Sequence, residues 1–368
     1  MNMKFKARKG NPDYVFIAFL VILVVFGLVM LMSASSDLGR ANFGDSFYFL
    51  KHQIFYGLIP GIIGFFFAYF FEYRIWEKIS LPALLVSILF LLLVFSPLGF
   101  RALGAERWVS IGGIQFQPGE LVKLTFIVYM AAWMGKKRAR GKKLGEGFLP
   151  MLMLLGAVLV PLVLQPATTT AGLIFASVLT MYFMSGARVK YVAATIALAA
   201  VGFVSLVMIT PYRMERILGF IHPQADPLGK TYQINQTLMA VGSGGVWGVG
   251  YGRSTTKLGA LPEPMGDSIF AVIGEELGFA GSIALILFFL LFVWRAFIIA
   301  KKTSDGFARL MVVGFGTLIG IQAFVHIGAN TGVIPLTGVP LPFISYGGTA
   351  LAVFLTMSGI IATISRGR

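Results

Sequence analysis

Long apolar runs separated by short polar segments dominate the chain. A helix that crosses the hydrocarbon core of a bilayer, about 30 Å thick, needs about 20 mostly apolar residues. Ten segments of this kind predict transmembrane helices at residues 14–34, 53–71, 79–97, 118–135, 147–164, 169–186, 189–210, 268–299, 308–330 and 345–365. We therefore expect an all-α polytopic membrane protein in which residues 1–368 form a single membrane domain.

The first apolar run resembles a secretory signal peptide, because basic residues precede it and Ser33-Ala34-Ser35 follows it. Its apolar core from Val15 to Met32 has 18 residues, whereas the core of a signal peptide has roughly 7–15. We interpret the run as a retained transmembrane helix.

Basic residues are distributed unevenly between the segments that connect the spans. Ten spans place both termini on one side, and most of the 30 Lys and Arg residues then lie on that side, including the tail 1–13 and the loop 136–143. Because Lys and Arg are in excess in cytoplasmic loops, we expect both termini in the cytoplasm and the spans in the cytoplasmic membrane. The loop 211–267, between spans seven and eight, is then extracytoplasmic. It is rich in Gly and Pro, and we expect short helices and re-entrant pieces on the outer leaflet.

Composition excludes several classes of protein. Hydrophobic residues make up 57% of the chain, charged residues 12%, and the mean hydropathy is +0.84, whereas soluble domains carry roughly 25% charged residues. The absence of Cys excludes disulfides and thiolate nucleophiles, and the three His residues are too scattered for a metal motif. Membrane topology accounts for much of the net charge of +15, so no nucleic-acid partner is needed. Basic cytoplasmic loops are also attracted to anionic membrane lipids.

Ionisable residues at membrane depth are costly and indicate function by default. Glu120 and Lys123 are three residues apart in the fourth span, so they share a helix face and can form an ion pair. Two interpretations stay open: a structural pair that joins two helices, and a substrate site in which Lys123 binds a phosphate.

A second acidic cluster, Asp267, Glu275 and Glu276, lies where the outer loop enters the eighth span. The three side chains cannot all face one site on a continuous helix. Asp267 is either a helix cap or a half-buried carboxylate whose pKa burial raises toward that of a general base. For the two glutamates, we expect hydrogen bonds between helices or to loop backbone.

The outer face also carries basic residues and an irregular segment. Arginines beside glycine-rich loops suit an anionic headgroup, although contact with lipid phosphates in general is the alternative; the set comprises Arg101, Arg107, Arg213, Arg216, Arg253 and Lys257. Residues 335–348 contain three prolines and cannot be helical throughout. Because such backbone is tolerated at membrane depth only in protein or along a cavity, we expect this segment to wall a site.

Several motifs together resemble the SEDS family (shape, elongation, division and sporulation) from end to end, its division members more closely than its elongation members. They include Gly104-Ala105-Glu106-Arg107-Trp108, the Gln-Pro-x-Glu-x-x-Lys stretch at 117–123, Gly242-Ser243-Gly244-Gly245, residues 267–278 and residues 341–348. The chain departs from the family pattern in three ways: Ala167 stands where an Asp is frequent, the neighbours of Asp267 are Gly266 and Ser268, and His326 stands where an Asn is common.

The resemblance implies a peptidoglycan glycosyltransferase that polymerises lipid II at the outer face of the cytoplasmic membrane in septal wall synthesis. It implies that Asp267 is the essential aspartate and that a class B penicillin-binding protein, an FtsI-like transpeptidase, is the partner, alongside other divisome membrane proteins. Substrate-binding residues under this interpretation are Arg107, Trp108, Glu120, Lys123, Arg253, Lys257, Ser345 and Tyr346.

The chemistry implied by the family displaces undecaprenyl pyrophosphate by a sugar 4-hydroxyl. Asp267 would accept the hydroxyl proton, and Arg107, Lys123, Arg253 and Lys257 would stabilise the pyrophosphate. A divalent cation, Mg²⁺ or Mn²⁺, held by Asp267 could share that work, and the polyprenyl tails would lie in a groove between spans. Three alternatives stay open: a lipid II flippase, an elongation polymerase, and a non-catalytic scaffold that recruits the transpeptidase.

Overall fold

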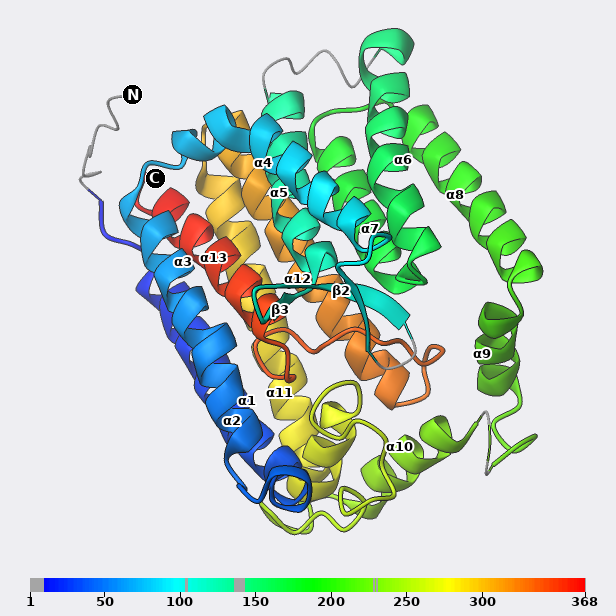
Figure 1. Cartoon of the computed structure of the whole chain (residues 1–368). Helices are drawn as coiled ribbons and strands as arrows, with labels where there is room; N and C mark the ends of the chain where they lie inside the picture. The colour runs from blue at the N-terminus through cyan, green and yellow to red at the C-terminus, as the bar shows by residue number, and fades with distance from the viewer. Residues whose placement is uncertain (1–9, 103–104, 136–142, 228, 230, 368) are drawn as a thin grey trace.

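The computed structural model describes residues 10–102, 105–135, 143–227, 229 and 231–367. The chain is a bundle of helices with one small sheet (Figure 1). Two short segments, η1 and η3, are π-helical and continue directly into α3 and α6. In chain order the elements are α1 (Tyr14–Phe43), α2 (Tyr48–Gln53), η1 (Ile54–Leu58), α3 (Ile59–Phe70), α4 (Arg74–Leu93), β1 (Gly99–Ala102), β2 (Ala105–Ile111), β3 (Ile114–Phe116), α5 (Pro118–Gly135), η3 (Leu144–Phe148), α6 (Leu149–Leu164), α7 (Thr168–Met184), α8 (Val189–Ile209), α9 (Pro211–Ile221), α10 (Tyr232–Ser243), α11 (Ile269–Lys302), α12 (Gly306–Asn330) and α13 (Gly348–Ser365).

A helix is present at each of the ten predicted spans. Within the described residues, eight helical runs are long and apolar enough to cross a membrane. The other two predicted spans coincide with α5, which carries Glu120 and Lys123, and with α7, an apolar helix of 17 residues. The prediction of a polytopic helical membrane protein is confirmed.

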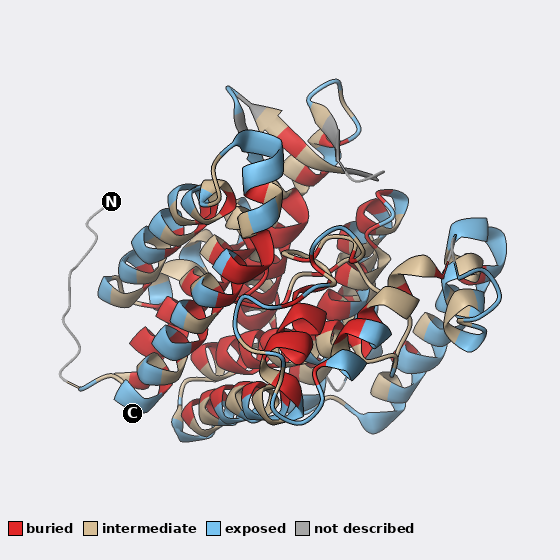
Figure 2. Ribbon diagram, turned by 90° about the horizontal axis from the view of Figure 1, so that it is seen from below, coloured by how far each residue is buried: buried red, intermediate tan, exposed pale blue. Residues whose placement is uncertain are grey.

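The helices divide into an inner and an outer set. In the most apolar part of α12 and α13, 72% and 78% of the residues are buried, compared with 11% in α8. Buried residues gather at the centre of the bundle, and exposed residues line its edge (Figure 2). Because the exposed edge of α8 is apolar, it suits contact with lipid tails rather than water.

The all-α prediction holds for the bundle, but residues 99–102 and 105–116 add a small sheet that the sequence did not predict. Its three antiparallel strands have the order β1-β2-β3, with Val109 opposite Phe116. Gly112 and Gly113 form the turn between β2 and β3, and both have positive φ values, 59° and 84°. A two-residue Gly-Gly turn is a strong hairpin signal. The long apolar runs had drawn the prediction toward helices alone.

The two termini meet at one end of the bundle. The backbone N–H of Asp13 donates to the Ser365 hydroxyl over 2.9 Å, and the Arg366 guanidinium donates to the Gly10 carbonyl over 3.4 Å. The short helices α9 and α10, and the turns between α10 and α11, lie at the opposite end (Figure 1). The arrangement agrees with the expected short helices in residues 211–267. The basic residues of the tail 1–9 and of the loop 136–142 lie outside the described residues.

Helix α11, which coincides with the predicted eighth span, is broken at Gly278. Gly278 has φ 68° and ψ −167°, so residues 269–277 and 279–302 are separate helical pieces. The preceding loop pairs with the break: Val249 N–H donates to the Glu275 carbonyl and Phe279 N–H to the Gly245 carbonyl, over 3.0 and 2.9 Å. These bonds satisfy backbone groups that the break would otherwise leave unpaired.

Candidate active site

A cavity of about 1270 Å³ opens at the end of the bundle that carries α9 and α10. The hairpin β2–β3, helix α9, the segment 263–267 and the segment 338–348 all contribute to its wall, and α2 closes another side. Asp267, Arg107, Trp108 and Tyr346 line it, so the structure brings together four of the predicted site residues.

Asp267 lies just before α11, and its main chain is fixed from two sides. The Asn330 amide of α12 donates to the Asp267 carbonyl over 2.9 Å, and the Ser345 hydroxyl donates to the neighbouring Gly266 carbonyl over 2.8 Å. The N-cap of α11 is Ser268, and this helix start has no side-chain cap hydrogen bond. The Asp267 carboxylate is therefore not the helix cap, which was the alternative to a functional role.

Electrostatics around Asp267 favour a base that works near neutral pH. Burial, followed by the negative charge of Glu263, raises the pKa of Asp267 to about 6, although Arg216 and Arg107 oppose the shift. Gly338 permits this arrangement: a Cβ there would lie 3.3 Å from Asp267 Oδ2 and 3.8 Å from an Arg107 guanidinium nitrogen.

Arginines on the cavity wall are anchored by backbone carbonyls. The Arg107 guanidinium donates to the carbonyls of Gln165 and Pro166. Arg216 donates to the Leu336 carbonyl over 3.0 Å, and Arg213 donates to the Val163 carbonyl over 3.0 Å. These carbonyls are neutral, so the guanidinium groups keep their positive charge beside Asp267, and the three arginines can bind an anion.

An apolar groove of about 740 Å³ adjoins the cavity. Helices α6, α7, α8 and α9 line it, and it shares Arg107, Arg213 and Arg216 with the cavity. A guanidinium cluster therefore lies where a polar chamber meets an apolar channel, as an amphiphile with an anionic headgroup requires.

Glu120 and Lys123 form the predicted ion pair, with 2.6 Å between Glu120 Oε1 and Lys123 Nζ. Both side chains are buried, and Lys123 also donates to Gln322 Oε1 over 2.9 Å. Neither belongs to the described lining of the cavity. Their geometry matches the structural interpretation, a pair that joins α5 to α12.

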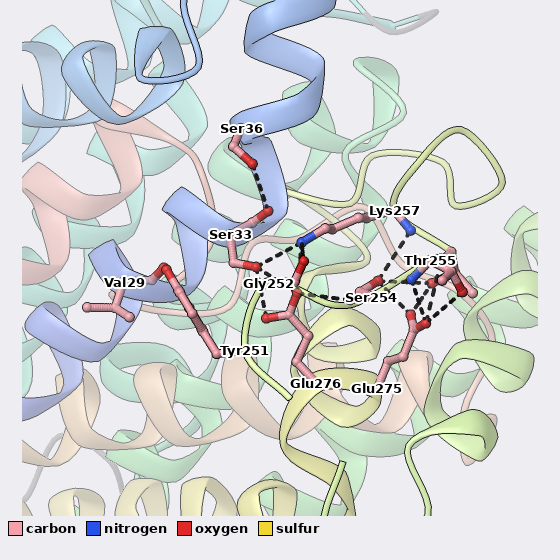
Figure 3. A network of polar contacts seen from close by, with 11 residues as sticks. Val29, Ser33, Ser36, Tyr251, Gly252, Ser254, Thr255, Lys257, Glu275 and Glu276 are labelled. Atoms are coloured by element: carbon pink, nitrogen blue, oxygen red, sulfur yellow. Dashed lines mark hydrogen bonds and ion pairs between the residues drawn. The ribbon is translucent and has the colours of Figure 1, made fainter. Parts of the chain in front are cut away.

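The predicted substrate residues of the glycine-rich loop lie elsewhere. Lys257 is buried and pairs with Glu276 at 2.9 Å, while it also donates to the Ser33 hydroxyl of α1 over 3.0 Å (Figure 3). Glu275 accepts from the Ser254 hydroxyl over 2.6 Å and from the Thr255 N–H over 2.9 Å. These contacts agree with the bonds to helices and loop backbone expected for the two glutamates.

Arg253 and Lys257 are not brought to the cavity. Arg253 is exposed on the same loop, and neither residue is among the described lining. The ammonium group of Lys257 already has three partners, the third being the Gly252 carbonyl at 3.0 Å. The network fixes the loop against α1 and α11.

Ser345 and Tyr346 have different roles in the wall. The Ser345 hydroxyl is buried, accepts from the Leu341 N–H and is directed at backbone. Tyr346 lines the cavity, and its hydroxyl lies 2.8 Å from His52 Nδ1 of α2. Residues of segment 335–348 line the cavity and the adjoining groove, the position expected for the wall of a site.

Three residues at the cavity were not assigned to the site from the sequence: Glu263, Arg216 and His52. Arg216 belonged to the outer basic set, but spacing gave no reason to place either Arg216 or Glu263 beside Asp267. Glu263 has a positive φ of 47°, a conformation that non-glycine residues adopt mainly at constrained sites. No local pattern marked His52, which comes from a distant part of the chain.

The described residues contain no group of three or more Asp, Glu, His or Cys side chains that could hold a metal ion. Asp267 and Glu263 offer two carboxylates. Mg²⁺ is commonly bound by one or two carboxylates plus substrate phosphates, so these residues fit an ion that a phosphate-bearing ligand would help to hold. Such an ion would add positive charge beside that phosphate.

Known proteins share both the sequence and the fold. A probable peptidoglycan glycosyltransferase FtsW from Geobacter sp. (strain M18) is 39% identical over 359 residues, 97% of this chain and 98% of the relative. Stage V sporulation protein E from Bacillus subtilis (strain 168) is 36% identical over 360 residues, 98% of each chain.

Solved structures show the same architecture. A chain in a structure described as "Structural coordination of polymerization and crosslinking by a peptidoglycan synthase complex" aligns with a TM-score of 0.80 and 26% identity, over 96% of this chain and 98% of the other. The crystal structure of the Thermus thermophilus rod shape determining protein RodA aligns with a TM-score of 0.70 and 25% identity, over 97% of both chains. A family model described as a cell cycle protein matches residues 13–368. The chain therefore belongs to the FtsW/RodA/SpoVE family of cell cycle proteins.

Proposed function

We propose that the chain is a peptidoglycan glycosyltransferase that polymerises lipid II at the outer face of the cytoplasmic membrane, in septal wall synthesis. The observation that carries this proposal is the position of Asp267. It is a half-buried carboxylate with a pKa raised to about 6, in a cavity whose arginines border an apolar groove. The named FtsW relatives support the same activity.

The reaction assigns a task to each part of the cavity. The 4-hydroxyl oxygen of one sugar bonds to the anomeric carbon of another, and the bond from that carbon to the pyrophosphate oxygen breaks. Asp267 accepts the hydroxyl proton as general base. Undecaprenyl pyrophosphate leaves with the bonding electron pair, and Arg107, Arg213 and Arg216 stabilise the charge that develops on it.

The groove between α6, α7 and α8 supports a lipid-linked substrate. Its lining is predominantly apolar, from residues such as Leu159, Phe203 and Val325. An isoprenoid tail in this groove would place its pyrophosphate at the three arginines. Contacts with the tail, which is remote from the reacting carbon, would then supply binding energy that helps to position the reacting groups.

Topology and partners follow from the same reasoning. The positive-inside rule assigns both termini to the cytoplasm, so the cavity faces outward, where lipid-linked sugars would be consumed. The similarity to a chain in a peptidoglycan synthase complex supports a class B penicillin-binding protein as partner. The proposal extends to other divisome membrane proteins.

A flippase would need the same groove and the same arginines but no base. The raised pKa of Asp267 and the main-chain bonds that position it favour the enzyme. A scaffold would need neither the cavity nor the groove.

The test is polymerisation by the purified protein. The full chain in nanodiscs, with and without a cognate class B penicillin-binding protein, would be given lipid II and assayed for glycan strands by gel electrophoresis. Glycan formation that requires Asp267 supports the proposal. Translocation of lipid II across vesicles without any glycan from either preparation would support the flippase instead.

A further inference from the structure

One end of the cavity is aromatic and is not used by the reaction described above. Its residues come from the end of α1, from α2 and η1, and from the segment before α13. We call this part of the cavity the aromatic end. It comprises Phe43, Tyr48, Phe49, His52, Tyr56 and Tyr346. None of these residues is among the described lining of the apolar groove, which does include the three arginines. The aromatic end and the groove therefore extend in different directions from Asp267.

Contacts among these side chains hold the aromatic end in place. The rings of Phe43 and Tyr48 stack with 3.7 Å between centroids, and Phe49 packs edge-on against Tyr346 at 5.4 Å. The Tyr346 hydroxyl and His52 Nδ1 are 2.8 Å apart. The ring centroids of His52 and Tyr56 are 4.5 Å apart. Because these contacts already hold the rings in place, a ligand that packs on them would cost little side-chain entropy.

The aromatic end is tied to the catalytic segment through backbone bonds. Tyr346 N–H donates to the Met265 carbonyl over 2.9 Å, two residues before Asp267. Gln53 of α2 accepts from the Gly347 N–H over 2.9 Å. A ligand bound at the aromatic end would therefore be held at a defined position relative to the Asp267 carboxylate.

The chemistry of this end suits a neutral sugar. Among its described residues there is no Lys or Arg, and its polar groups are the His52 imidazole and the hydroxyls of Tyr48, Tyr56 and Tyr346. The Gln115 and Gln117 amides belong to the same cavity wall. The ion pair of Lys51 and Asp45 is solvent-exposed and is not part of the lining. Sugars present C–H faces that pack on aromatic rings, and hydroxyls that bond to a few well-placed polar groups.

We propose that the aromatic end binds the acceptor sugar, the terminal N-acetylhexosamine whose 4-hydroxyl attacks. The inference rests on the proposed function. The three arginines and the groove receive the donor's pyrophosphate and tail. A nucleophile approaches the anomeric carbon from the face opposite the leaving group, so the acceptor lies on the side of Asp267 away from the arginines. That side is the aromatic end.

The test separates the acceptor from the donor. The donor is a lipid II analogue whose terminal sugar lacks the 4-hydroxyl, so it cannot attack; the acceptor is the soluble disaccharide-pentapeptide methyl glycoside. Initial coupling rates are measured while each is varied in turn. We expect His52→Ala and Tyr56→Leu to raise the KM for the acceptor about tenfold, the loss expected for about 1.4 kcal/mol of contacts, while the KM for the donor stays within twofold.

The matched control is Phe66→Leu. Phe66 is 49% exposed and Tyr56 is 52% exposed, both on the α2–α3 run, but only Tyr56 lines the cavity. An increase in donor KM, or an unchanged acceptor KM in both variants, would overturn the proposal.

Direct binding of the soluble acceptor to the Asp267→Asn protein, by saturation-transfer NMR, tests the site without turnover. If His52→Ala and Tyr56→Leu abolish this binding but the parent chain with Asp267 intact makes no glycan, the proposed function is refuted and the sugar site stands. Equal binding by the parent and both variants would refute the sugar site alone.

Discussion

Asn330 of α12 donates its side-chain N–H to the Asp267 carbonyl over 2.9 Å, and the same amide donates to the His326 carbonyl over 3.0 Å. One side chain thus fixes the catalytic segment against a helix whose interior is almost fully buried. The carboxylate of Asp267 is free to face the cavity because its main chain, rather than its side chain, bears the structural contacts.

Removal of this contact should impair catalysis more than folding. We expect Asn330→Ala to lower kcat about tenfold, since small misplacements of a base are costly, with lipid II binding nearly unchanged. The control is Asn235→Ala, which removes a comparable bond to the Pro223 carbonyl of 2.9 Å, remote from Asp267. Equal polymerisation rates in the two variants would contradict a positioning role for Asn330.

Asp267→Asn should lower glycan formation at least about a hundredfold, because a general base contributes typically 10²–10⁴-fold. Lipid II binding should persist, since no positive charge is lost. Polymerisation within about threefold of the parent would mean that Asp267 is not the base.

The pH dependence of the parent follows from the pKa of about 6 for Asp267. The base must be ionised, so kcat/KM should fall about tenfold per pH unit below pH 6 and level off above it. The pKa of Asp267 in the folded protein lies above the value of about 3.9 for the unfolded chain. Protonation of this carboxyl therefore stabilises the folded state at low pH, and this stabilisation is lost as the pH rises through 6. Asp267→Asn should therefore not lower Tm at pH 8. A rate that stays flat from pH 5 to 8 would oppose this assignment.

Breaking the buried pair should destabilise the protein. Lys123→Met leaves the Glu120 charge buried and unpaired, which costs about 3–5 kcal/mol. The control is Lys143→Met: Lys143 and Glu146 have the same spacing and a similar distance, 2.7 Å, but both are exposed, so the change should be below about 1 kcal/mol.

The double variant Glu120→Leu/Lys123→Met tests whether Lys123 also contacts substrate. With both charges removed, most of the stability should return. Thermal unfolding in detergent measures this, and recovery of stability together with activity would confine the pair to a structural role. Stable but inactive protein would restore the substrate interpretation of Lys123.

Two glycine-to-alanine substitutions should change the stability of the protein in opposite directions. Gly278→Ala places a Cβ 2.2 Å from the Gly248 nitrogen at a position with φ 68°, so we expect a marked loss of stability. Gly156→Ala in α6 meets nothing within 4 Å and should stabilise the helix by about 0.5–1 kcal/mol. Thermal unfolding of both variants is the measurement, and a neutral Gly278→Ala would mean that the break in α11 can be rearranged.

Cysteine labelling tests the topology in this cysteine-free chain. Gln224 and Arg188 are exposed. Arg188 directly precedes α8, a helix of 21 residues, and Gln224 follows α9, which begins beyond the other end of α8. Gln224→Cys should react with an impermeant maleimide added outside intact cells, and Arg188→Cys should react only after permeabilisation. The reverse pattern would place the cavity in the cytoplasm.

Apolar periods and charge asymmetry were sufficient to predict ten helices, the membrane class and the common side of the termini. Those properties depend on composition averaged over about 20 residues at a time, and they need no knowledge of which helices touch. The Glu120–Lys123 ion pair could also be predicted from the sequence, because residues three apart on a helix share a face.

The active site depended on contacts between distant segments. The sequence placed Lys257 and Arg107 in the same outer basic set. In the structure Lys257 is buried and forms an ion pair with Glu276. Arg107 reaches the cavity instead, because β2 folds over the loop at Pro166. His52 and Tyr346 are 294 residues apart, and no pattern along the chain joins them. Only tertiary structure decides which charges are neutralised inside the protein and which remain available to a substrate, because that depends on the partners each side chain meets in space.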